Sequence, residues 1–158
     1  MFRELRRKKQ ELSYQECIEI LINEKRGVLS VLGDDDYPYG VPLNHFYNEE
    51  DGCIYFHGGK IGHRIDAIKK HDKVSYCVHD EGYKNEGEWS LNFKSVIVFG
   101  RMEIVEDETI TADITRKICY KFTDDEEYIK NEFERSFKAT LLTRLKPEHM
   151  CGKRVNES

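Results

Sequence analysis

Residues 55–68 read YFHGGKIGHRIDAI, and the pattern of this stretch changes twice along its length. It begins as an apolar strand, breaks at three closely spaced glycines, and resumes with isoleucines at helical spacing. Glycine lets a backbone approach a ligand closely, and a helix start presents N–H groups that attract anions. Because Lys60, His63 and Arg64 add positive charge to this loop, the stretch predicts a phosphate site. The alternative is a solvated basic turn without a ligand.

The rest of the chain predicts a run of short strands with a few helices. Ser13 and Glu16 form a capping box at the start of a first helix, which we expect Gly27 to end. Pro42 cannot donate to a strand ladder, so its strand should have an edge, a bulge or a free backbone segment there. The strands are expected at 28–32, 39–47, 53–57, 74–79, 93–105 and 139–145. Further helices are expected at 61–70, at 110–119 and from 124 onward, and a long polar loop is expected at 80–92.

Strands joined mostly by hairpins, with helices set between them, are typical of one fold class. They predict an α+β fold that is mainly β, with a small antiparallel barrel and flanking helices. We expect one domain over residues 1–158, because the sequence shows neither an internal repeat nor a linker.

Composition and charge exclude several classes of protein. The formal net charge is −5, so general attraction to nucleic acid or to an anionic membrane is not expected. No apolar run approaches the roughly 18 residues of a membrane span, and the basic N-terminus lacks the apolar run of a signal peptide. We therefore expect a cytoplasmic protein without nucleic-acid or membrane partners.

The cysteines predict free thiols rather than a disulfide framework, because they are odd in number and show no C-x-x-C spacing. They are Cys17, Cys53, Cys77, Cys119 and Cys151. His45 and His79 accompany them, but no pair has the local spacing of a zinc site. No metal site is predicted.

Several segments resemble one known family. These are GVPLN at 40–44, YFHGGKIGHRIDAI at 55–68 and SVIVFGRMEIVED at 95–107. They are similar to the pyridoxamine 5'-phosphate oxidase-like FMN-binding split-barrel proteins. MFRELRRKKQEL at 1–12 and GDDDYPYGVPLNHFY at 33–47 further resemble the nitroimidazole-resistance proteins within that family. The resemblance covers nearly the whole chain in order, and it implies a split β-barrel homodimer with FMN at the subunit interface.

The same resemblance implies a role for each matching segment. The residues that would lie along the flavin ring are Val41, Pro42, Leu43 and Asn44. Those that would pass beneath the flavin are Phe56, His57 and Gly58. Those that would hold the FMN phosphate are Lys60, Gly62, His63 and Arg64. Those that would reach the ring from the other subunit are Ser95 and Val96. His57 matches a histidine implicated in the flavin chemistry, so the resemblance implies that it is catalytic.

The resemblance implies an FMN-dependent oxidoreductase that reduces small molecules, with 5-nitroimidazole-type nitro groups as one substrate class. Flavin carries this chemistry itself, which agrees with the lack of any acid–base constellation in the sequence. A flavin- or haem-binding carrier without strong turnover is the second hypothesis. A pyridoxine-phosphate oxidase-type enzyme is the third, and it ranks last because Glu148, His149 and Met150 do not match the true oxidase. No nicotinamide site is recognisable, so the electron donor stays open.

Overall fold

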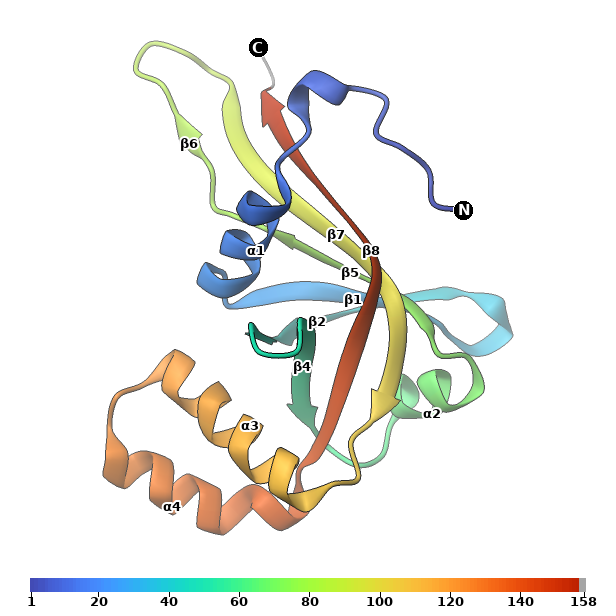
Figure 1. The fold of residues 1–158 in the computed structure, drawn as a ribbon, viewed down its shortest axis with the longest axis vertical. Coiled ribbons are helices and arrows are strands. Elements are labelled where there is room, and N and C mark those ends of the chain that lie inside the picture. Colours follow the sequence, from blue (N-terminus) through green and yellow to red (C-terminus); the bar gives the residue numbers. More distant parts are fainter. Residues whose placement is uncertain (157–158) are drawn as a thin grey trace.

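One curled antiparallel sheet of eight strands forms the body of the molecule in the computed structural model, which describes residues 1–156 (Figure 1). The strands are β1 (Arg26–Leu32), β2 (Pro38–Asn44), β3 (Phe46–Asn48), β4 (Cys53–Gly58), β5 (Lys73–His79), β6 (Tyr83–Lys84), β7 (Leu91–Ile104) and β8 (Leu141–Asn156). Their order is β2-β1-β5-β7-β8-β4-β3, and β6 pairs with the start of β7. This curled sheet with flanking helices is a split barrel of the α+β class, as predicted.

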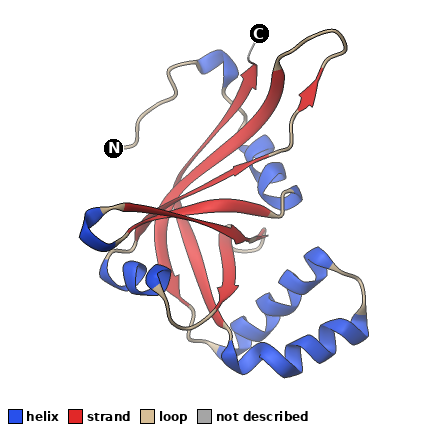
Figure 2. Ribbon diagram, turned by 180° about the vertical axis from the view of Figure 1, so that it is seen from behind, coloured by secondary structure: helices blue, strands red, loops and turns tan. Residues whose placement is uncertain are grey.

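Within residues 1–156, four α-helices lie at the margins of the sheet (Figure 2). They are α1 (Tyr14–Asn23), α2 (His63–Lys70), α3 (Glu108–Phe122) and α4 (Glu126–Ser136). Both views place α3 and α4 together as a hairpin at one end of the sheet (Figures 1 and 2). Asp107 and Asp125 cap these two helices through their carboxylates. Among the described residues, no helix has the length and apolar character needed to cross a membrane.

The first helix begins as predicted but ends earlier. The Glu16 N–H donates to the Ser13 hydroxyl at 3.2 Å, and the Ser13 N–H donates to the Glu16 carboxylate at 2.9 Å. The helix stops at Asn23, so the interpretation of Gly27 as its C-terminal signal is wrong. Gly27 lies in β1, where a Cβ atom would be 2.5 Å from the Cys77 carbonyl oxygen. This glycine therefore permits close contact between β1 and β5.

The expected strand 39–47 is two strands, β2 and β3, separated at His45. The His45 N–H donates to the Lys25 carbonyl, and its side chain is buried with 1% exposure. A buried polar ring needs specific partners, so this residue turns the chain inward instead of continuing the ladder. β2 lies at one edge of the sheet, which confirms the edge expected from Pro42.

The last strand is much longer than the expected 139–145, because β8 continues to Asn156. Its second half pairs with β7 despite Pro147, which lies opposite Gly100 at a register shift. A Cβ atom at Gly100 would be 2.0 Å from the Lys146 carbonyl oxygen. The missing side chain and the bulge accommodate the proline, so residues beyond 145 form a paired strand as well.

Three smaller corrections concern one loop and the ends of two helices. Ile61 lies outside α2 and is 91% exposed, so it is not part of the apolar stripe of that helix. The expected loop 80–92 contains β6 (Tyr83–Lys84), which extends the sheet locally. α3 begins before 110 and ends after 119, since Asp107 caps it and Thr123 follows its last turn.

The core lies mainly on the inner face of the curled sheet. Leu29, Tyr76, Val98 and Leu145 are each fully buried there, together with residues of α1 and α2. A second, smaller cluster lies under α3 and joins that helix to β4 and β8. Its members are Cys53, Tyr55, Val105, Ile114, Ile118 and Leu142.

Candidate functional site

A pocket of about 350 Å³ opens where the end of β2 meets the end of β4. It is lined by Arg26, Pro42, Leu43, Asn44 and His57. The fold thus brings the predicted segments 41–44 and 56–58 to one place, although they belong to different hairpins. The Arg26 Nε donates to the Asn44 Oδ1 at 2.8 Å, which fixes one wall of the pocket.

The strand that forms this wall is anchored from inside. Val41 and Leu43 pack partly against the core, while Pro42 is exposed on the opposite face. The buried Tyr76 hydroxyl lies 2.9 Å from the Leu43 carbonyl and 2.8 Å from Nδ1 of His45. These contacts fix the position of the end of β2 relative to the core.

His57 lies at the mouth of the pocket because of strand alternation in β4. Phe56 before it is fully buried and contacts the Tyr76 ring edge-on, with centroids 4.9 Å apart. The His57 ring points the other way and reaches solvent, but surrounding atoms still remove part of its hydration. This burial lowers the pKa of His57 below 6.5, the Arg64 charge lowers it further, and Glu132 opposes the shift. Burial and the Arg64 charge therefore favour the neutral ring.

Arg64 is the cation that the structure places beside this histidine. Its Nη2 lies 2.8 Å from where a Cβ atom on Gly58 would be, so the guanidinium occupies the space a side chain would need. Its Nη1 donates to the Thr143 hydroxyl at 3.4 Å. Within residues 1–156 no carboxylate lies within 4.0 Å of it, and burial lowers the pKa of Arg64. A half-buried cation without a counter-ion favours an anionic ligand.

The other two basic residues of the loop have different partners. The Lys60 ammonium donates to the Lys138 carbonyl at 2.6 Å, which ties the loop to the segment after α4. The Asp34 N–H donates to Nε2 of His63 at 3.2 Å, and the His63 ring stacks on Tyr39 with centroids 4.2 Å apart. Of the three basic residues expected at the phosphate, Lys60 and His63 thus have partners within the chain, whereas Arg64 lacks a carboxylate partner.

Gly62 begins α2 with φ of 130°, a conformation that favours glycine, and no side chain caps this end of the helix. The first N–H groups of α2 consequently have no partner within the helix. Ser95 and Val96 lie on β7, away from the lining of the pocket in the same chain. Val96 is fully buried in the core, whereas Ser95 is half-exposed on the outer face.

Two residues at this site were missed by sequence reasoning. Arg26 belongs to no motif in the sequence, yet it is the first residue of β1 and lines the pocket. Thr143 lies on β8, fully buried, and contacts both Arg64 and the Phe56 carbonyl. A buried threonine in an apolar strand was the available signal, because a buried hydroxyl requires partners.

The outer face of the sheet carries an apolar row that continues from the pocket. Strand register places Pro42, Val28, Cys77, Ile97 and Cys151 side by side across β2, β1, β5, β7 and β8. Val28 is 42% exposed, and the others are exposed or half-exposed. We call these five residues the outer row. An apolar row of this kind on the surface is a candidate interaction face.

Solved structures with the same fold include three that align over most of both chains. One is a candidate 5-nitroimidazole antibiotic resistance protein from Bacteroides thetaiotaomicron, with 18% identity, a TM-score of 0.78, and 92% of this chain and 87% of that chain covered. Another is a conserved hypothetical protein from Mycobacterium tuberculosis, with 14% identity, a TM-score of 0.80 and coverage of 95% and 90%. A third is a FAD-binding protein from Mesorhizobium loti, with 23% identity, a TM-score of 0.67 and coverage of 92% and 97%.

These identities are low, so the solved structures establish the shared fold. No curated protein matches the chain significantly in sequence. The family model described as pyridoxamine 5'-phosphate oxidase matches residues 13–154. This range includes all residues that line the pocket and every strand except the last two residues of β8. The chain therefore belongs to the pyridoxamine 5'-phosphate oxidase family.

Proposed function

We propose that the protein binds FMN in the pocket at His57 and uses it to reduce small molecules, with nitroaromatic compounds as a substrate class. One observation carries the assignment. The half-buried Arg64 guanidinium lies beside Gly58 and His57 without a carboxylate partner, at the loop that opens α2. A phosphate monoester would supply the missing negative charge. Membership of the family and the FAD-binding name of one similar structure support a flavin in particular.

The residues present fit such a ligand. The Arg64 guanidinium and the uncapped N–H groups of α2 would hold the phosphate, and the glycine at position 58 leaves room for the guanidinium. The edge strand β2 would present its unpaired backbone groups to the ring, from Pro42 to Asn44. Lys60 and His63 would serve mainly to fix the loop, because both already have other partners.

The protein's part in the reaction is to bind, orient and exclude water. Bound flavin would supply the electron transfer, so no acid–base pair from the chain is required. The neutral His57 ring, which burial favours, can donate one hydrogen bond and accept another at the mouth of the pocket. We propose that it orients the ring or the substrate there.

We further propose that two chains associate through the outer row, so that Ser95 and the backbone at Val96 of one subunit approach the pocket of the other. The outer row ends at Pro42, which also lines the pocket, so a partner covering the row would complete the site. Light scattering should give twice the chain mass of 18.7 kDa. Ile97→Asp should give a monomer that loses flavin, whereas Ile97→Val should leave both unchanged.

The decisive experiment begins with the purified protein. We expect visible flavin absorbance, and release of the chromophore by denaturation should identify FMN by mass. Anaerobic incubation of the reduced protein with a 5-nitroimidazole should then reoxidise the flavin and consume the nitro compound. His57→Ala should change turnover more than FMN affinity. Tight FMN binding without turnover on a panel of nitroaromatics and quinones would favour the carrier hypothesis, and failure to bind any flavin would refute the proposal.

A further inference from the structure

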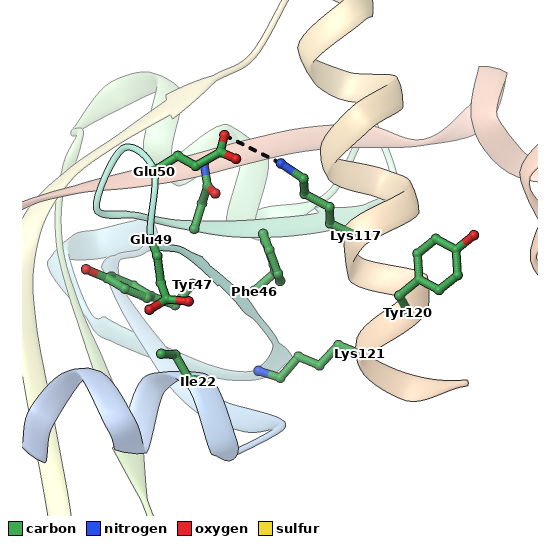
Figure 3. A pocket seen from close by; sticks show the side chains of 9 residues that line it. Ile22, Phe46, Tyr47, Glu49, Glu50, Lys117, Tyr120 and Lys121 are labelled. Atoms are coloured by element: carbon green, nitrogen blue, oxygen red, sulfur yellow. Dashed lines mark ion pairs between the residues drawn. The ribbon is translucent and has the colours of Figure 1, made fainter. Parts of the chain in front are cut away.

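A second pocket lies on another part of the molecule, between α1, β3 and α3 (Figure 3). Its volume is about 470 Å³, and it shares no lining residue with the pocket at His57. Ile22, Phe46 and Tyr47 form its apolar wall, and Lys117 and Lys121 extend into it from α3. Nothing in the proposed flavin chemistry uses these residues.

Lys121 is the unusual group of this pocket. Its ammonium donates to the Glu24 carbonyl at 2.6 Å and to the His45 carbonyl at 2.9 Å. An ammonium has three donors, so one N–H is left over. In residues 1–156 no carboxylate lies within 4.0 Å of this nitrogen. Burial lowers the pKa of Lys121 to about 8, the nearby Lys25 lowers it too, and Glu24 opposes the shift.

The other charges of the pocket are already accommodated. Lys117 pairs with Glu50 at 3.6 Å and with Asp113 at 3.0 Å, as the dashed line to Glu50 shows (Figure 3). Glu49 lines the pocket and is exposed, so its carboxylate is open to solvent. The half-buried Lys121 cation is therefore the charge whose desolvation is least compensated.

An anion with a flat apolar body matches this arrangement. A carboxylate could accept the remaining Lys121 N–H, and an aromatic ring could pack against the side chains of Phe46 and Tyr47. A doubly charged anion fits less well, because Glu49 and Glu50 lie at the rim. We propose that this pocket is a second binding site, specific for a small aromatic monocarboxylate.

The test uses benzoate as the probe and benzamide as its neutral isostere, followed by amide NMR shifts of the full-length protein. Benzoate should shift the signals of Phe46, Tyr47 and Lys121 and bind about tenfold more tightly than benzamide, because only benzoate offers a charge-assisted bond. Lys121→Met should remove this preference. Equal affinities for the two compounds, or benzoate shifts confined to the loop around Arg64, would overturn the proposal.

A matched pair of variants tests the same charge effect if Lys121→Met does not fold. Ile22 is 37% exposed, so Ile22→Glu and Ile22→Gln introduce side chains of the same size at a tolerant position. The glutamate should weaken benzoate binding about tenfold relative to the glutamine, through repulsion next to Lys121. Glu49→Gln should strengthen benzoate binding for the same reason. Identical benzoate affinities in both Ile22 variants would overturn the site, since charge would then play no part.

Discussion

Replacing Arg64 with methionine separates the phosphate site from every other contribution to flavin binding. Methionine keeps the length and apolar stem of the side chain but removes the guanidinium. Hydrogen bonds to charged groups contribute about 1.5–3 kcal/mol each. Because Arg64 is partly exposed, solvent screens its charge, and we expect the loss in FMN binding free energy to be about 2–3 kcal/mol in total. FMN should therefore bind about 30- to 150-fold more weakly.

The assay compares two ligands that differ only in the phosphate. FMN and riboflavin are titrated into the apoprotein, and binding is followed by flavin fluorescence. Arg64→Met should weaken FMN binding while leaving riboflavin binding nearly unchanged. His63→Gln is the control, because the Nε2 of His63 is already bonded to the Asp34 N–H and should contribute little. If both ligands weaken equally in Arg64→Met, or if His63→Gln loses as much FMN affinity, the assignment of Arg64 to the phosphate is refuted.

The same variant should not destabilise the apoprotein. Within residues 1–156 the Arg64 guanidinium makes one hydrogen bond, the long one to the Thr143 hydroxyl, and removing an unpaired half-buried cation relieves its desolvation. We expect the free energy of unfolding in urea to change by less than about 1 kcal/mol. A much larger loss would show that Arg64 acts in folding, and the affinity data would then need reinterpretation.

Three further predictions follow from buried contacts. Burial and the Lys121 charge lower the pKa of His45 to about 4, so the folded state favours the neutral ring. Keeping this ring neutral should contribute about 3 kcal/mol to the free energy of unfolding, in full above pH 6.5, and this contribution should be lost as the pH falls to about 4. His45→Gln should therefore flatten this part of the stability–pH curve measured by urea unfolding. Gly100→Ala should be severely destabilising, because its Cβ would lie 2.0 Å from a carbonyl oxygen, whereas Gly59→Ala, with 3.9 Å to its nearest atom, should change the melting temperature little. Tyr76→Phe should cost about 1–3 kcal/mol in the same urea assay, because the Leu43 carbonyl and His45 lose a buried partner; an unchanged midpoint would show that water replaces the hydroxyl.

Local signals in the sequence determined much of the fold. The capping box at Ser13, the edge implied by Pro42 and the strand–glycine–helix unit at 55–68 all depend on residues within a few positions of one another. Propensity and hydrogen bonding act at this short range, so the pattern alone is informative. The fold class followed from these elements, and the family resemblance agreed with it.

Only the tertiary structure decided where distant residues meet. β8 continues past Pro147 because Gly100, on another strand, makes room for it, and no pattern within 139–156 reveals that contact. Arg26 reaches the pocket because the curl of the sheet brings the start of β1 and the end of β4 together. Long-range register depends on pairing across the whole sheet, which local sequence does not encode.

The candidate site divides in the same way. The sequence placed basic residues beside a glycine loop, but it could not show which of them had other partners. Lys60 and His63 are held by groups from the segment after α4 and from the β1–β2 turn, whereas Arg64 is left without a carboxylate. A charge is free for a ligand only when the folded chain offers it no counter-ion, and that depends on every segment packed around it.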